Sequence, residues 1–338
     1  MRKLKLYFAT VLLAVIAALS CPTGKTVCAD ATGGEYYIGG MTAGFTLSQG
    51  GAEVIGLNEV VSDDGIHRPA EEAGIRTGDC IVAIDGIRIK NINELNAALE
   101  RSAGKQISVT VRRGGDTAET NVTPAKDKKS GRYKIGVLIR DTLSGIGTVT
   151  YIEKNTLRFG ALGHGVSDDE KSGLTVADPK VYLCSIVGIN KGSRGKAGEL
   201  RGLFLNDKPL ASADFVCETG LYGNFNTNYD FSRTEIVHTA SISETTVGKA
   251  FIYSTIDGIC PQKYEISIVK VDAGQRDNKN FVIKVNDERL IAETGGIVQG
   301  MSGSPIIQNG KLIGAVTHVF LNDPTRGYGI GIENMLKK

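Results

Sequence analysis

The chain has 338 residues, with 43 glycines, 11 tyrosines and no tryptophan, and its formal net charge is +2. This length predicts about two domains, each large enough to bury a core, and the small net charge gives no reason to expect a nucleic-acid partner. The glycine content favours short strands and many turns over long helices.

The N-terminal segment has the pattern of an export signal. Three basic side chains within the first five residues precede a mostly apolar run over residues 6–19, which is shorter than the ~18 apolar residues of a membrane span. Residues 29–31 read Ala-Asp-Ala, a cleavage motif of the A-x-A kind. Residues 1–31 are therefore predicted to be a signal peptide or a temporary membrane anchor. A lipoprotein cysteine at Cys21 is a weaker match.

Residues 36–123 form the first predicted folded unit. Its signature runs from Pro69 to Asp79, with Ala-Gly-Ile and Gly-Asp steps, and continues into an apolar strand and an Asp-Gly turn. A helix follows, because Asn91 is a good N-cap with Glu94 three residues on. This string resembles a PDZ domain, whose fold holds a peptide as an added strand with its C-terminal carboxylate in a glycine loop.

The best match to that carboxylate loop is Thr42-Ala43-Gly44-Phe45. We therefore expect these four residues to bind a peptide end. The alternative is a PDZ domain that serves only as a rigid internal clamp.

The cysteines give no sign of a metal site. Cys80, Cys184, Cys217 and Cys260 are scattered singly, without a CxxC pair or a histidine at metal spacing. We expect mostly buried small side chains, with one disulfide as an option, and neither a metal nor a cofactor. Cys80 should lie in a strand of the core.

A basic linker is predicted over residues 124–132, and residues 133–338 read as consecutive short strands with polar turns, which suits a β-barrel. A hairpin formed by residues 148–152 and 156–161 should carry His164 to the end of a strand. A histidine between glycines at a strand end can be positioned as a general base. His318 is the rival.

The stretch Gly300-Met301-Ser302-Gly303-Ser304-Pro305 has the form of a nucleophile turn. Glycines allow a tight bend, so that the serine oxygen projects into a cleft beside converging backbone N–H groups. Ser302 is the predicted nucleophile and the N–H groups of Gly300 and Ser302 the oxyanion hole, with Ser304 as rival. A hairpin follows, with Asn309-Gly310 as a type I′ turn. Met301 cannot pair with a new N-terminus as the acidic residue of trypsin-like zymogens does.

The chain also resembles a known family. It is similar to the stage IV sporulation protein B (SpoIVB) peptidases from the signal through the PDZ unit to the peptidase domain. The matching strings are residues 134–141, 144–148, 160–164, 294–306 and 318–330. Gly165 departs from the bulkier residue expected after the histidine.

The resemblance implies a mainly β fold, with a signal or anchor, a PDZ domain and a chymotrypsin-like double β-barrel serine peptidase domain. It places the nucleophile at Ser302, the base at His164 and the acid at Asp287. Asp287 lies only 15 positions before the serine, and Asn286–Arg289 fits a solvated turn equally well.

The resemblance further implies export across the inner forespore membrane into the intermembrane space, with initial membrane association. The partners would be the chain's own N-terminal segment, through self-cleavage, and a membrane-bound regulator of an intramembrane protease, whose cleavage triggers late mother-cell transcription. We expect the PDZ unit to recognise residues 22–34 and to couple this recognition to activity. The alternatives are an HtrA-like quality-control protease, whose PDZ domain follows the protease, and a non-catalytic PDZ scaffold.

Overall fold

The computed structural model describes residues 34–165, 177–205, 208–274 and 278–337. The predicted signal or anchor over residues 1–31, with Cys21, lies outside these ranges. Within the described ranges, no helix is both long and apolar enough to cross a membrane.

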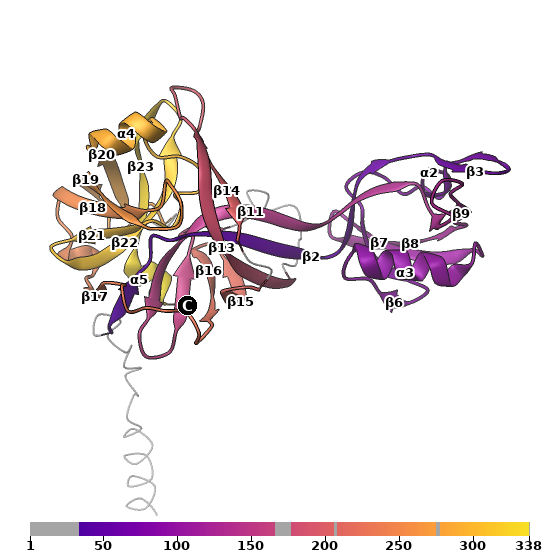
Figure 1. Cartoon of the computed structure of the whole chain (residues 1–338), viewed down its shortest axis with the longest axis horizontal. Coiled ribbons are helices and arrows are strands. Elements are labelled where there is room, and N and C mark those ends of the chain that lie inside the picture. Colours follow the sequence, from indigo (N-terminus) through magenta and orange to yellow (C-terminus); the bar gives the residue numbers. More distant parts are fainter. Residues whose placement is uncertain (1–33, 166–176, 206–207, 275–277, 338) are drawn as a thin grey trace, which may run out of the picture.

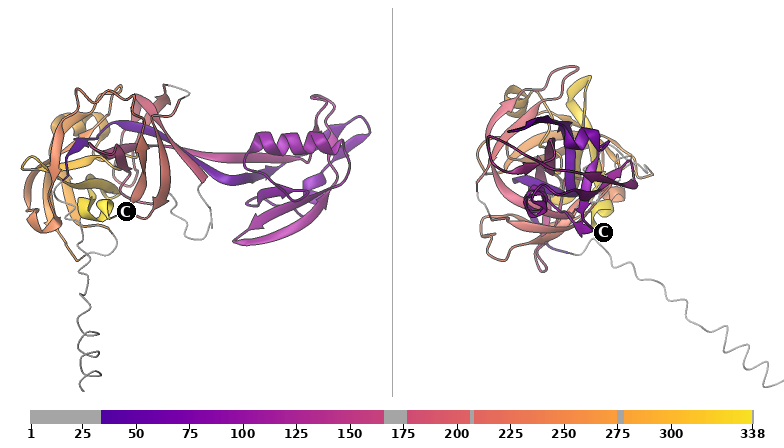
Figure 2. Two further views of the ribbon diagram at one scale, coloured as in Figure 1. Left: turned by 90° about the horizontal axis from the view of Figure 1, so that it is seen from below. Right: turned by 90° about the vertical axis from the view of Figure 1, so that its right-hand side faces the viewer.

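The molecule consists of two bodies joined by a long two-stranded ribbon (Figures 1 and 2). The ribbon is made of strands β2 (Thr42–Leu57) and β11 (Val137–Glu153), which run antiparallel from one body into the other. Thr42 pairs with Thr148 in the larger body, and Leu57 pairs with Val137 in the smaller one. The smaller body is thus an insertion between two neighbouring strands of the larger one.

The first half of the larger body is a closed barrel of six strands. Around the ring, β2 pairs with β11, then follow β12, β16, β15 and β13, and β13 pairs with β2 again. The bounds of these additional strands are β12 (Arg158–Ala161), β13 (Ala177–Asn190), β15 (Ala211–Cys217) and β16 (Gly220–Phe225). Phe45, Phe159 and Leu221 are buried in its core. Two short elements flank it, β1 (Tyr36–Ile38) and β14 (Glu199–Phe204).

The second half is another closed ring of six strands. In order around the ring it contains β22, β21, β18, β19, β20 and β23. Phe281, Tyr264 and Met301 are buried in its core. The bounds are β17 (Ile236–Thr239), η1 (Ile242–Glu244), β18 (Gly248–Ser254), β19 (Gln262–Val271), β20 (Phe281–Val285), α4 (Glu288–Thr294), β21 (Pro305–Gln308), β22 (Lys311–Phe320), β23 (Asp323–Gly331) and α5 (Ile332–Leu336).

The hairpin of β21 and β22 confirms the expected turn, because Asn309 and Gly310 both have positive φ, 51° and 75°. A type I′ turn requires this conformation at both central positions.

The smaller body packs two helices against a sheet around its own core, which includes Val54, Leu95 and Val109. The predicted helix is α3, and the side chain of Asn91 accepts a hydrogen bond from the N–H of Glu94 as an N-cap should. Further elements are β3 (Val60–Ser62), β4 (Gly65–His67), α2 (Pro69–Glu72), β5 (Cys80–Ile84), β6 (Ile87–Arg88), α3 (Ile92–Ser102), β7 (Ile107–Arg113), β8 (Asp116–Val122), β9 (Ala125–Lys126) and β10 (Tyr133–Lys134).

The structure corrects the expected loop Thr42-Ala43-Gly44-Phe45. These residues are the start of β2 in the first barrel, where they pair with β11 on one side and β13 on the other. Thr42, Ala43 and Phe45 are buried, and a side chain on Gly44 would collide with the ring of Phe204. The four residues belong to the barrel and cannot form the carboxylate loop of the smaller body.

The boundaries of the smaller body also differ from the expectation. The expected linker over 124–132 is an ordered hairpin, since β9 pairs with β10 and the side chain of Asp127 binds Ser130 and Lys134. The connection between the bodies is the β2–β11 ribbon. A paired ribbon holds two bodies more firmly than a flexible linker.

The four cysteines of the described residues are free thiols. Cys80 and Cys184 are buried, as expected for small core side chains, and burial raises the pKa of Cys184 to about 11. Cys260 is exposed.

Candidate active site

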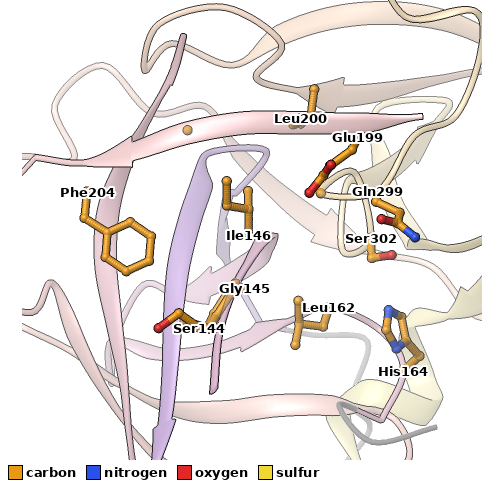
Figure 3. A pocket seen from close by; sticks show the side chains of 13 residues that line it. Ser144, Gly145, Ile146, Leu162, His164, Glu199, Leu200, Phe204, Gln299 and Ser302 are labelled. Carbon is orange, nitrogen blue, oxygen red and sulfur yellow. The ribbon is translucent and has the colours of Figure 1, made fainter. Parts of the chain in front are cut away.

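A cavity of about 660 Å³ lies between the two barrels and contains the predicted nucleophile and base. Figure 3 shows Ser302 and His164 on its wall, together with the apolar side chains of Ile146, Leu162, Leu200 and Phe204. The lining residues outside the catalytic turn come from β2 (Phe45), β11 (Ser144–Ile146) and β14 (Glu199, Leu200, Gly202, Phe204), with Leu162 beside His164. The cavity can therefore accept an extended chain along a mostly apolar wall.

The serine turn is held in place by the first barrel. The hydroxyl groups of Thr148 and Thr150 in β11 donate hydrogen bonds of 2.8 Å to the carbonyls of Gly300 and Gly303. The N–H of Thr148 also donates to the carbonyl of Ser302 at 2.9 Å. Both threonines are buried, so these bonds are shielded from water.

Glycine is required at position 303. Its φ is +94°, and a Cβ there would lie 2.1 Å from the carbonyl oxygen of Thr148. Any side chain would push β11 away from the turn, and the three bonds that fix the serine would be lost.

Two backbone N–H groups of the turn are free to bind an oxyanion. Met301, Gly303 and Ser304 donate their N–H groups to Val298, Val316 and Met301, respectively. The N–H groups of Gly300 and Ser302 donate to no acceptor within the described ranges. These are the two groups that the sequence predicted as the oxyanion hole, and an oxyanion hole needs donors that are unoccupied before the reaction.

His164 follows β12 and has the tautomer that a general base needs. Its Nδ1 lies 2.6 Å from the carbonyl oxygen of Gly165. A carbonyl only accepts hydrogen bonds, so Nδ1 carries the proton and Nε2 is left as the proton acceptor. Leu162 and Gly163, which precede the histidine, both have φ of +71°, an unfavourable conformation for leucine.

The hydroxyl of Ser302 donates to the carbonyl of Thr317 at 2.9 Å. Because a hydroxyl has one proton, this proton must turn away from Thr317 before it can pass to His164.

His318, the rival base, is also close. Its ring centroid is 5.1 Å from that of His164, with the rings tilted by 40°. His164 lines the cavity, whereas His318 is not among the lining residues. The rival nucleophile Ser304 is fully buried, so a substrate could not reach it. Met301 is also fully buried, in the second barrel's core, and the turn is anchored there by apolar packing.

Asp287 is not brought to this site. It is the N-cap of α4, where its carboxylate accepts from the N–H groups of Arg289 and Leu290 and pairs with the guanidinium of Arg289 at 3.0 Å. The hydrogen bond from Arg289 lowers the pKa of Asp287, and burial opposes this effect. Asp287 does not line the cavity either. Asp287 therefore caps α4 and is not placed to orient His164 as predicted. The observed partner of the His164 Nδ1 is the backbone carbonyl of Gly165.

Changing Asp287 to alanine should lower stability more than turnover. Losing an N-cap costs about 1 kcal/mol in the free energy of unfolding, and we expect kcat/KM within about tenfold of wild type. Asp287→Ser is the matched control, since serine restores the cap without a carboxylate. Denaturant unfolding and peptide turnover would be measured for both variants. A loss of 10³ or more in both, as an acid of a catalytic triad would give, contradicts the capping role.

The sequence did not point to several residues that build the site. Phe45, Thr148 and Thr150 come from strands that nothing in their spacing links to Ser302, and Leu200 and Phe204 reach the cavity from β14. The described residues contain no group of three His, Cys, Asp or Glu side chains arranged to hold a metal ion.

Two family models match this chain. Residues 131–336 match the family model described as SpoIVB peptidase S55, and residues 66–113 match a PDZ domain model.

Among curated proteins, the zinc metalloprotease RasP of Shouchella clausii is 30% identical over 24% of this chain and 18% of its own length. A putative zinc metalloprotease of Lactococcus lactis is 32% identical over 28% of this chain and 23% of its own length. The chain thus spans less than a quarter of the length of these two relatives.

One solved structure, the PDZ domain of the SdrC-like protein from Listeria monocytogenes, is 22% identical. It covers 27% of this chain and 87% of its own, with a TM-score of 0.22.

Proposed function

The chain belongs to the SpoIVB peptidase S55 family, a family of serine peptidases, and from this premise we propose that it hydrolyses peptide bonds through an acyl-enzyme on Ser302. The observation that carries the proposal is the shared cavity, in which Ser302, His164 and the free N–H groups of Gly300 and Ser302 come together. The two closed barrels with the site between them support a chymotrypsin-like arrangement.

The proposed chemistry follows from the hydrogen-bonding groups. The Oγ of Ser302 attacks the carbonyl carbon while Nε2 of His164 takes its proton, and the oxyanion is bound by the two free N–H groups. His164 then gives the proton to the leaving amine, which frees the C-terminal product. A water molecule, deprotonated by His164, attacks the acyl-enzyme; His164 then returns the proton to Oγ of Ser302 as the ester bond breaks, and the N-terminal product leaves with a carboxylate.

In the cell, we propose, the protein is exported across the inner forespore membrane and is at first membrane-associated through residues 1–31. Its substrates would be its own N-terminal segment and a membrane-bound regulator of an intramembrane protease, with late mother-cell transcription as the outcome. This proposal is supported by the family membership and by the basic and apolar pattern of the first residues.

The HtrA-like alternative receives less support, because the PDZ body is inserted between β2 and β11 and does not follow the barrels. A non-catalytic scaffold would not need two free N–H groups beside a serine in a cavity.

A fluorophosphonate probe tests the proposed function. The probe should label the purified full chain covalently, and the label should be found on Ser302 by mass spectrometry. Incubation should also shorten the N-terminal segment of the wild-type chain and leave that of Ser302→Ala intact. A folded protein that takes up no label at Ser302 would contradict the proposal.

A further inference from the structure

Strand β11 has one free edge along the ribbon. From Val137 to Thr148 it pairs with β2 alone, and its next partner, β12, begins opposite Val149. The other edge of β2 is already occupied, by β5 in the smaller body and by β13 in the barrel. At these paired positions of the described chain, an added strand can join the ribbon at β11 but not at β2. A row of unpaired N–H and C=O groups of this kind is a template for an extended peptide.

One end of this edge enters the active-site cavity. The N–H of Thr148 bonds to Ser302, and its C=O accepts from Leu162, so both groups point away from β2. Successive residues of a strand alternate in this respect, so the backbone groups of Ile146 and Ser144 also point away from β2. Both residues line the cavity beside Ser302. A peptide paired with this part of β11 would lie next to the nucleophile.

The other end of the edge borders a groove in the PDZ body. A cavity of about 410 Å³ lies between α3 and the segment Lys134–Ile139, and its lining includes Ile92, Leu95 and Leu99 of the helix. Leu138 and Ile92 are partly exposed in it. The N–H of Ile92 donates to the carboxylate of Asp141 at 2.7 Å, which fixes the first turn of α3 to β11. The groove thus has an apolar wall on one side and a strand edge on the other.

The floor of this groove has donors for a carboxylate. Neither Ile135 nor Gly136 donates its N–H to an acceptor in the described part of the chain. Gly136 has φ of +78°, and a Cβ there would lie 2.3 Å from the carbonyl of Asn58, so this position must be glycine. Successive free N–H groups around a positive-φ glycine form a nest for an anion. The loop that was expected at residues 42–45 is therefore best matched by Ile135-Gly136.

We propose that a substrate binds to both ends of this edge at once, as a strand added to β11. Its C-terminal carboxylate lies at Ile135 and Gly136, its last apolar side chains face α3, and its scissile bond reaches Ser302. For substrates other than the chain's own N-terminal segment, the preferred substrate is then a chain with a free, apolar C-terminus. The inference rests on the proposed peptidase function.

The direction and length of the bound chain follow from the strand. With its carboxylate at the start of β11, a peptide antiparallel to β11 runs from the barrel toward the PDZ body, so the residues after the scissile bond cover the ribbon. Gly136 lies directly before β11, and Ile146 lies within β11 ten positions further on. Cleavage should therefore fall about ten residues before the C-terminus, because extended chains rise by a nearly constant ~3.3 Å per residue.

Binding can be measured without catalysis. Fluorescent peptides of 4, 8, 12 and 16 random residues ending in valine would be titrated, by anisotropy, into full-length Ser302→Ala protein. Affinity should rise on the order of tenfold between 4 and 12 residues and then level off, because the second contact becomes intramolecular. Amidation of the C-terminus should remove most of the affinity.

Two pairs of variants locate the contact. In Leu138→Glu, which changes the groove, peptide affinity should no longer depend on a free C-terminal carboxylate. Ile87 is a similarly exposed apolar residue of the PDZ body outside the groove, and Ile87→Glu should keep this dependence. Ser144→Pro removes a backbone N–H from the edge of β11, so affinity should no longer rise with peptide length. Ser144→Ala keeps that N–H, so the rise in affinity with peptide length should remain. The proposal is overturned if amidated and free peptides bind with the same affinity, or if affinity does not change with peptide length.

Cleavage positions give a second readout. Wild-type protein would digest a library of twenty-residue peptides, with sites mapped by mass spectrometry. We expect sites to cluster about ten residues before a free C-terminus and to scatter after amidation. Scattered sites in both libraries overturn the inference while leaving the peptidase function intact. A protein that cleaves nothing contradicts the proposed function, and the anisotropy series still decides whether the β11 edge binds peptides.

Discussion

Replacing Ser302 with alanine is expected to lower kcat/KM for peptide cleavage by a factor on the order of 10⁴ to 10⁶. The hydroxyl supplies the atom that bonds to the substrate carbonyl, and no other described residue of the turn exposes a hydroxyl to the cavity. The backbone of the turn is held by Thr148 and Thr150 through carbonyl groups, which the substitution keeps. The free energy of unfolding should therefore change little.

Ser304→Ala is the matched control for this prediction. Ser304 is fully buried and its Oγ has no hydrogen-bond partner in the described structure, so its removal should leave turnover within about tenfold of wild type. Turnover of defined peptides and circular dichroism would be recorded for both variants. Wild-type-like turnover in Ser302→Ala, or a comparable loss in Ser304→Ala, would contradict the assignment of the nucleophile.

Replacing His164 with alanine should lower kcat by a factor on the order of 10⁴ or more, because no proton acceptor then activates Ser302. In the wild type, kcat/KM should fall as the pH is lowered, because a protonated imidazole cannot accept the proton of Ser302. The sign follows from the role, since a base works only in its unprotonated form. The pH–rate profile would be measured on a short peptide.

His318→Ala separates the two neighbouring histidines. His318 lies beside His164 but does not line the cavity. His318→Ala should therefore lower kcat much less than His164→Ala does, and the shape of the pH–rate profile should not change. A flat profile in the wild type, or an active His164→Ala protein, would remove His164 from the mechanism. A full loss in His318→Ala alone would make His318 the base.

The family and the local structure around the proposed catalytic serine could be predicted from the sequence because their signals are local. The glycine-flanked turn around Ser302, the Asn309-Gly310 hairpin and the Asn91 cap depend on residues within a few positions of one another. Steric rules for glycine, turns and caps act at this range, so the pattern specifies the local conformation. The order of the helix and strands within the PDZ body could be predicted for the same reason.

Partner choice over long distances was decided only by the tertiary structure. The sequence suggested that Thr42–Phe45 is a loop of the PDZ unit, and nothing in its pattern predicts that these residues pair as a strand with residues 145–148 across an inserted domain. The role of Asp287 also could not be predicted from the sequence alone. Its sequence position fits an acid or a residue of a solvated turn, and the structure shows instead that it caps α4 and pairs with Arg289.

The sequence by itself thus identified the chain as a PDZ-containing member of the SpoIVB peptidase family, and it predicted Ser302 as nucleophile and His164 as base. The tertiary structure alone decided that the PDZ body interrupts the first barrel and that one strand, β11, touches both the serine turn and the PDZ groove. The physical reason is that strand pairing depends on backbone hydrogen bonds between segments far apart in the chain, which any alternating sequence can make.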